Sequence, residues 1–107
     1  MMIAKVTGSL VATQKVETLV GHKLMLVEPY RLDPATRDSL VGSGRVLVVV
    51  DTVGAGIDEM VLVTQGSSAR LTPETKSLPV DAVIVGILDT VHVAQTCVYN
   101  KEQKPSP

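Results

Sequence analysis

Residues 51–70, DTVGAGIDEMVLVTQGSSAR, place two loops of small residues on either side of one apolar strand. The loops are GAGIDE and GSSAR, and the strand between them is MVLVT. Glycine has no Cβ and adopts positive φ at little cost, so such loops let a second backbone, an anion or another subunit approach closely. The pattern therefore predicts a crowded junction, and the rest of the sequence must indicate what occupies it.

The composition predicts one small domain that associates with itself. A chain of 107 residues hides only about 60–70% of its unfolded surface on folding. It is nevertheless 45% hydrophobic, almost entirely through aliphatic residues, with Tyr30 and Tyr99 as its two aromatics. Because soluble monomers seldom expose large apolar patches, this surplus favours buried contacts between subunits. We expect a single β-barrel domain over residues 1–99 and a flexible tail over residues 100–107.

Charge and cysteine content restrict the partners and the compartment. A formal net charge of −1 gives no electrostatic reason to expect nucleic acid or an anionic membrane as a partner. Cys97 stands alone, so no internal disulfide is possible and a reducing cytoplasm is expected. No stretch approaches the roughly 18 apolar residues of a membrane span, and the first residues do not read as an export signal. We expect a cytoplasmic protein.

Runs rich in β-branched residues predict strands, and no segment has a long helical pattern. The strands are expected at residues 3–13, 23–27, 45–51, 60–64 and 82–93. Apolar residues on both faces of the 45–51 run predict a central, doubly covered strand, and Gly86 predicts a bulge or bend. Residues 30–44 read as a surface loop holding at most one helical turn, and residues 67–71 as a second such turn.

This pattern predicts an all-β fold. A chain of this size with about five strands and short helical turns favours a closed or nearly closed five-stranded OB-like barrel, with a small open sandwich as the alternative. OB-like barrels often bind single-stranded nucleic acid through a basic groove and aromatic stacking platforms. Both are missing from this composition, so we do not expect nucleic acid as a partner.

The sequence carries no recognisable catalytic, cofactor or metal motif. The GAG of the first loop resembles the start of a dinucleotide fingerprint, but Glu59 stands where the third glycine belongs and a strand pattern follows. His22, His92 and Cys97 are isolated, which predicts a polar strand position for His92 and a small buried hydrophobe for Cys97. We therefore expect no enzyme, no cofactor and no metal.

Two charged residues end the small-residue loops, Glu59 after GAGID and Arg70 after GSSA. A carboxylate and a guanidinium can pair bidentately and fix an orientation. Our hypothesis is that one or both of these side chains cross a boundary between subunits. Ser67 and Ser68 fit no nucleophile motif and are expected to be turn or cap residues.

Three segments in the same order resemble a known family, namely residues 3–29, 49–70 and 79–91. The resemblance is to the small pentameric vertex proteins of bacterial microcompartment shells, of the carboxysome and ethanolamine-utilisation type, and it covers almost the whole chain. One position departs from the family pattern GAGxGE, because Asp58 stands where the family usually has glycine.

The resemblance implies a β-barrel subunit that assembles into a ring of five and caps the vertices of a polyhedral shell in the cytoplasm, beside hexagonal shell proteins. A hexameric ring is the nearest alternative assembly. A ring-forming regulatory barrel, with a small molecule or an anion held by the GAG loop amides, is the alternative function. The resemblance also implies that the subunit contacts and the five-fold axis lie near Gly54, Ala55, Gly56, Glu59, Gly66, Ser67, Ser68, Ala69 and Arg70.

Overall fold

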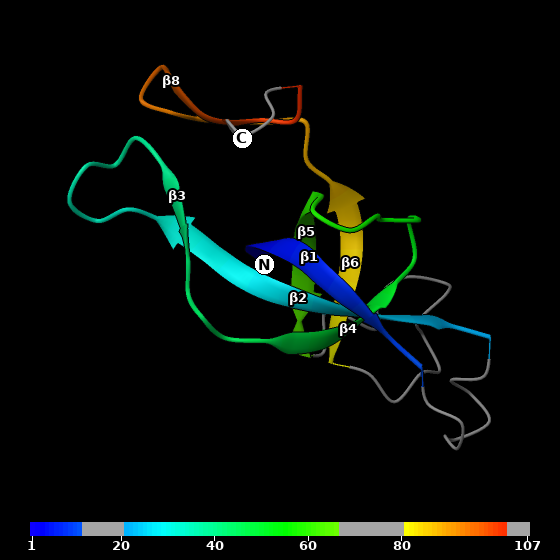
Figure 1. Cartoon of the computed structure of the whole chain (residues 1–107). Coiled ribbons are helices and arrows are strands. Elements are labelled where there is room, and N and C mark those ends of the chain that lie inside the picture. Colours follow the sequence, from blue (N-terminus) through cyan, green and yellow to red (C-terminus); the bar gives the residue numbers. More distant parts are fainter. Residues whose placement is uncertain (12–20, 67–80, 103–107) are drawn as a thin grey trace.

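A computed structural model describes residues 1–11, 21–66 and 81–102 of the chain. Within these residues the secondary structure consists of strands (Figure 1). They are β1 (Met2–Leu10), β2 (Lys23–Leu32), β3 (Leu40–Gly42), β4 (Leu47–Asp51), β5 (Met60–Gln65), β6 (Ala82–Ile87), β7 (Thr90–Val93) and β8 (Thr96–Asn100). The described residues contain no helix long and apolar enough to span a membrane.

Five of the strands close into a barrel. The sheet runs in the order β1-β5-β6-β4-β2-β3, and β1 also pairs with β2, so the first five strands of that order form a ring and β3 extends it beside β2. The pairs are antiparallel except β4 with β6, which run parallel at Val50↔Val83 and Asp51↔Ile84. The prediction of a small, five-stranded OB-like barrel is thus confirmed, with one additional strand on it.

Alternating side chains fill the barrel with aliphatic groups. Ala4 and Val6 on β1 point inward, as do Met25 and Val27 on β2, because successive residues of a strand face opposite sides. Fully burying an aliphatic side chain of this size contributes about 1.5–3 kcal/mol. The buried members of the core are Ala4, Val6, Met25, Val27, Val49, Ala55, Val61, Val63, Ala82 and Ile84.

The predicted double coverage of the central strand holds only for the end of β4. Val49 belongs to the barrel core, and Val50 packs with Val83 in a second buried cluster on the other face. Val46 and Val48, earlier in the predicted strand, are exposed. The apolar run 45–51 therefore contains more aliphatic surface than the isolated chain buries.

The surface loop predicted over residues 30–44 is wrong at both ends. β2 continues to Leu32, and Leu40–Gly42 forms β3 in antiparallel register with it. The turn-forming composition of residues 33–39 obscured these flanking apolar positions. Between the strands, the amide of Arg37 donates to the Asp33 carbonyl over 2.8 Å, a bond with the spacing of one helical turn.

The single long strand predicted over residues 82–93 is two strands. Leu88 and Asp89 separate β6 from β7, and the Leu88 amide donates to the Met60 carbonyl over 2.9 Å. The predicted irregularity at Gly86 is confirmed, since the β5–β6 register shifts there. β7 turns back through Ala94 and Gln95, both at positive φ, to form a hairpin with β8. This hairpin is a separate two-stranded sheet beside the barrel (Figure 1).

Candidate functional site

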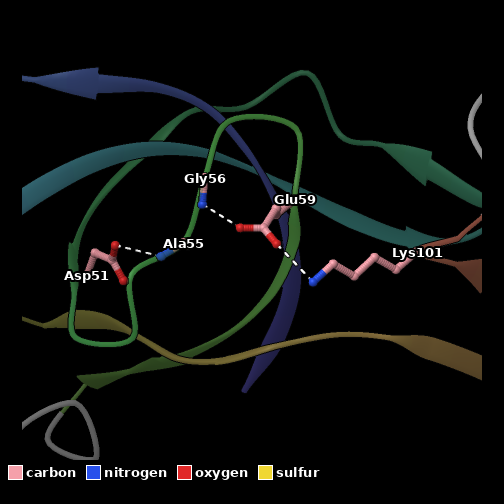
Figure 2. A network of polar contacts seen from close by, with 5 residues as sticks. All are labelled: Asp51, Ala55, Gly56, Glu59 and Lys101. Atoms are coloured by element: carbon pink, nitrogen blue, oxygen red, sulfur yellow. Dashed lines mark hydrogen bonds and ion pairs between the residues drawn. The ribbon is translucent and has the colours of Figure 1, made fainter.

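The loop between β4 and β5 is shaped first by the carboxylate of Asp51. Its Oδ1 accepts hydrogen bonds from the amides of Val53 and Gly54, each 3.0 Å long, and its Oδ2 accepts one of 2.9 Å from Ala55. Figure 2 shows the bond to Ala55. Aspartate commonly binds the backbone just after it in turns, because its short side chain reaches those amides. One side chain thus fixes the first half of the loop.

The middle of the loop is part of the barrel core. Ala55 is 1% exposed and packs with the core side chains, while Gly54 before it has a φ of 81°, a conformation that disfavours residues with a Cβ. Burial of Ala55 anchors the loop against the barrel. The GAG sequence therefore forms a turn that packs, through Ala55, against the core of its own barrel.

Glu59 holds the second half of the loop. Its Oε1 accepts a hydrogen bond of 2.5 Å from the Gly56 amide, and its Oε2 pairs with Nζ of Lys101 at 3.2 Å (Figure 2). The Gly56 hydrogen bond chiefly, with the neighbouring Lys101 ammonium, lowers the pKa of the Glu59 carboxyl. The same pairing raises the pKa of Lys101. Glu59 is thus held as a carboxylate at neutral pH.

Backbone pairing ties the loop to β1 as well. The Asp58 amide donates to the Val6 carbonyl over 2.8 Å, and the Val6 amide donates to the Glu59 carbonyl over 2.9 Å. These two bonds pair the loop's last residues with the middle of β1. The loop is thus fixed by two carboxylates, one core side chain and one strand.

The glycines do not all take the conformation expected of them. Gly54 and Gly66 have φ values of 81° and 67°, but Gly56 has no positive φ. A Cβ at Gly56 would instead lie 3.2 Å from Oε1 of Glu59, so this position is kept small by the carboxylate. The left-handed residue near the loop tip is Asp58, with a φ of 70°, at the position where the family pattern has glycine.

The amides of the GAG loop already donate hydrogen bonds within the chain. Four consecutive N–H groups, from Val53 to Gly56, donate to the carboxylates of Asp51 and Glu59. An anion nest needs such amides to be free and the surroundings not to be acidic. The geometry therefore disfavours an anion in this loop, the alternative that the sequence left open.

The predicted interface residues fall into two groups. Gly54, Ala55, Gly56 and Glu59 are brought together in the loop before β5, whereas Gly66 lies at the other end of β5. There the Gly66 amide donates to the Asp81 carbonyl over 2.7 Å. The remaining predicted residues lie outside the described part of the chain, and with them the proposed role of Arg70. They are Ser67, Ser68, Ala69 and Arg70.

Sequence reasoning missed two residues of this loop's framework. Asp51 was read only as the end of a strand, although an aspartate directly before a glycine-rich turn is a known signal for side-chain capping. Lys101 lay in the predicted tail, and no sequence pattern linked it to Glu59. The Asp51 contacts are local, to amides two to four residues further along the chain, whereas the Glu59–Lys101 pair joins residues that only the folded chain brings together.

The other chemically interesting side chains lie apart. His92 is exposed on β7, as predicted, but the prediction of a buried Cys97 is wrong, because β8 lies in the hairpin beside the barrel and exposes it. The described residues hold no cluster of three or more His, Cys, Asp or Glu side chains able to bind a metal ion.

Comparisons with known proteins agree on one family. The sequence pattern described as "Ethanolamine utilisation protein EutN/carboxysome" matches residues 1–89. The carboxysome shell vertex protein CcmL of Synechocystis sp. is 43% identical over 103 residues, which span 94% of this chain and 95% of that protein.

Solved structures extend this likeness to the fold. The structure of Gloeobacter violaceus CcmL matches with a TM-score of 0.84 at 39% identity, over 96% of this chain and all of that one (100%). The GrpN pentameric microcompartment shell protein of Rhodospirillum rubrum matches with a TM-score of 0.72 at 42% identity, over 88% of this chain and 99% of that one.

Proposed function

The chain belongs to the EutN/carboxysome family, and on that premise we propose that it is a structural subunit of a bacterial microcompartment shell, assembled as pentamers that cap the shell's vertices. The observation that carries the proposal is the match along 88% of the chain to a structure described as a pentameric shell protein. We place the protein in the cytoplasm, within such a shell, in contact with hexagonal shell proteins. Its role is assembly, without a reaction of its own.

Ring geometry supplies the mechanism. A head-to-tail contact closes into a ring when its rotation divides the circle, and a ring of five introduces curvature that a flat layer of hexagons lacks. A contact of standard size, near 800 Å² per partner, is enough, because each subunit of a closed ring makes two. The exposed aliphatic side chains Val46, Val48, Val53 and Ile57 offer apolar surface for such contacts.

The bonding within the GAG loop supports assembly over ligand binding. The loop's amides and carboxylates bond to one another, and Ala55 is buried, so the loop presents a fixed shape and few free polar groups. A fixed shape lowers the entropy that ordering would cost on association. We propose that this loop, with Gly54, Ala55, Gly56 and Glu59, lies at the subunit contact, as does the Gly66 to Arg70 segment.

Co-expression with hexagonal shell proteins tests this function. We expect closed polyhedra by electron microscopy when this chain is present, and open sheets or tubes when it is left out. A thermal melting temperature that is unchanged by inorganic phosphate or nucleotides is expected as well. Closed shells of the same form without the chain, or a phosphate-dependent rise in melting temperature, would contradict the proposal.

A further inference from the structure

An open groove of about 430 Å³ lies between the barrel and β7. Its walls are mainly apolar, with Ile3 from β1, Leu32 from β2, Leu62 from β5 and Val93 from β7 among the lining residues. Arg31 is the one charged side chain in this lining, all of which belongs to the described part of the chain, and it is exposed. The groove is thus apolar, with one positively charged side chain in its lining.

Among the described strands, β7, which forms one wall of the groove, is paired only with β8. β7 pairs with β8 in a separate two-stranded sheet, and a lone hairpin is only marginally stable in water unless a face is packed. Val91 and Val93 line the groove, whereas the alternate residue His92 is exposed and does not. An apolar element seated in the groove would pack this face and hold the hairpin in place.

We propose that the groove receives the loop of residues 53–58 from a second copy of this chain, an inference that rests on the ring assembly proposed above. A head-to-tail ring needs two different, complementary faces on each subunit. The loop lies on the β6 side of the barrel, and β3, which helps to line the groove, lies on the opposite side (Figure 1). The loop and the groove are therefore two different faces of one subunit, as a head-to-tail contact requires.

Charge distinguishes two of the exposed apolar segments as occupants of the groove, the loop and the start of β4. Val53 and Ile57 of the loop are exposed beside the acidic Asp58, whereas Val46 at the start of β4 is exposed beside Arg45. Seating β4 would bring a second cation to Arg31, and like charges at an interface are strongly disfavoured. Seating the loop brings Asp58 to Arg31 instead. The sign of the charges therefore favours the loop over β4.

Charge variants test this contact through the ring's dissociation. Arg31→Glu places an acid opposite Asp58, and we expect it to raise the concentration at which half of the rings dissociate by about tenfold or more, the effect of roughly 1.4 kcal/mol. Asp58→Asn added to Arg31→Glu should restore most of the loss, because it removes the repulsion while asparagine tolerates the left-handed conformation. Arg45→Glu is the matched charge reversal outside the groove, and it should change the dissociation of the rings clearly less than Arg31→Glu.

Several outcomes would overturn the inference. Rings that Arg31→Glu leaves unchanged, or that Asp58→Asn does not rescue, exclude the pairing. Rings strengthened by Arg31→Glu point to β4 with its Arg45. A native chain that forms rings in any of these cases leaves the proposed function standing, whereas a native chain that stays monomeric removes the proposed function as well.

Thiol labelling gives a second measurement that does not perturb the ring's charges. In a Cys97→Ser background, Val93→Cys faces the groove and His92→Cys, its neighbour on the opposite face of β7, is the control. We expect a maleimide to label Val93→Cys at least about tenfold more slowly in assembled rings. Equal labelling rates would overturn the inference. Slow labelling of Val93→Cys that persists in dissociated chains would also overturn it. The same holds if deleting residues 103–107 from intact rings restores fast labelling. Either result would place a segment of the same chain in the groove.

Discussion

Glu59 and Lys101 form an ion pair with 3.2 Å between Oε2 and Nζ, and this contact joins the loop before β5 to the residue that follows β8. The Lys101 amide also donates to the Asp89 carbonyl over 2.8 Å, which closes the base of the hairpin. The position of the hairpin is therefore coupled to the position of the GAG loop. In the proposed ring, the loop would contact one neighbour, and the hairpin would help to form the groove that receives the loop of the other.

Glu59 should make stability depend on pH. Its pKa is lowered from the ordinary value of 4.5, so its contribution is present above that pH and is lost as the pH falls through the folded-state pKa. We expect Glu59→Gln to weaken the pH dependence of the free energy of unfolding, measured by urea unfolding from about pH 3 to about pH 6. Asp33 also has a lowered pKa, so Asp33→Asn is the control, because it removes the contribution of another carboxylate to the pH dependence of stability. A curve that Glu59→Gln leaves unaltered would contradict this assignment.

Gly56 and Glu59 should be energetically coupled. An alanine Cβ at Gly56 would lie 3.2 Å from Oε1 of Glu59 and push the carboxylate off the Gly56 amide. We expect Gly56→Ala to lower the free energy of unfolding by about 1–3 kcal/mol, the range for losing a hydrogen bond to a charged acceptor, here at a partly buried donor. In a Glu59→Ala background the same change should cost clearly less, because the obstructing group is gone. Strictly additive losses in this double-mutant cycle would exclude the coupling.

Asp58 occupies a conformation that suits glycine. With a φ of 70°, it is in the left-handed region, which costs most residues about 1–2 kcal/mol and aspartate less. We expect Asp58→Val to lower the free energy of unfolding by about that amount and Asp58→Gly to leave it within about 0.5 kcal/mol or raise it. Asp38→Val is the control, because Asp38 is exposed and is not itself at positive φ. A valine tolerated equally at both positions would mean that the loop tip adopts another conformation.

Thr64 carries a buried hydroxyl without a hydrogen-bond partner in the described part of the chain. A buried polar group without a partner is costly, so Thr64→Val should raise the free energy of unfolding by about 1 kcal/mol. Thr7→Val is the comparison, because the Thr7 hydroxyl does donate to the Leu26 carbonyl. A clear loss of stability in Thr64→Val, measured by urea unfolding, would show that its hydroxyl is bonded outside the described residues.

The barrel itself was predictable because short runs of aliphatic, mostly β-branched residues mark its strands, and buried side chains alternate with less buried ones in the middle of β1 and β2. The hairpin was not, because its turn uses Ala94 and Gln95 at positive φ, where a two-residue hairpin turn normally has asparagine, aspartate or glycine. The apolar run from β6 into β7 then read as one strand. β3 was hidden for a related reason, since turn-forming residues surround its three positions.

The GAG loop was recognisable from sequence, but its mechanism was not. Small residues indicated close approach, and the structure shows that what approaches Gly56 is the chain's own Glu59. The hypothesis that Glu59 or Arg70 crosses a subunit boundary stays a prediction, because Arg70 lies outside the described residues. Within the described residues, Glu59 pairs with Lys101, a contact that the sequence did not indicate. Contacts between residues this far apart in sequence depend on tertiary packing, which local patterns do not encode.

The mass of the purified assembly under native conditions tests the central proposal most directly. A ring of five predicts a particle of five times the 11.3 kDa of one chain, stable on dilution and unchanged by added phosphate or nucleotide. Native mass spectrometry separates this value from that of a ring of six. A chain that remains monomeric at high concentration, with its groove and its GAG loop both open to water, would contradict the account.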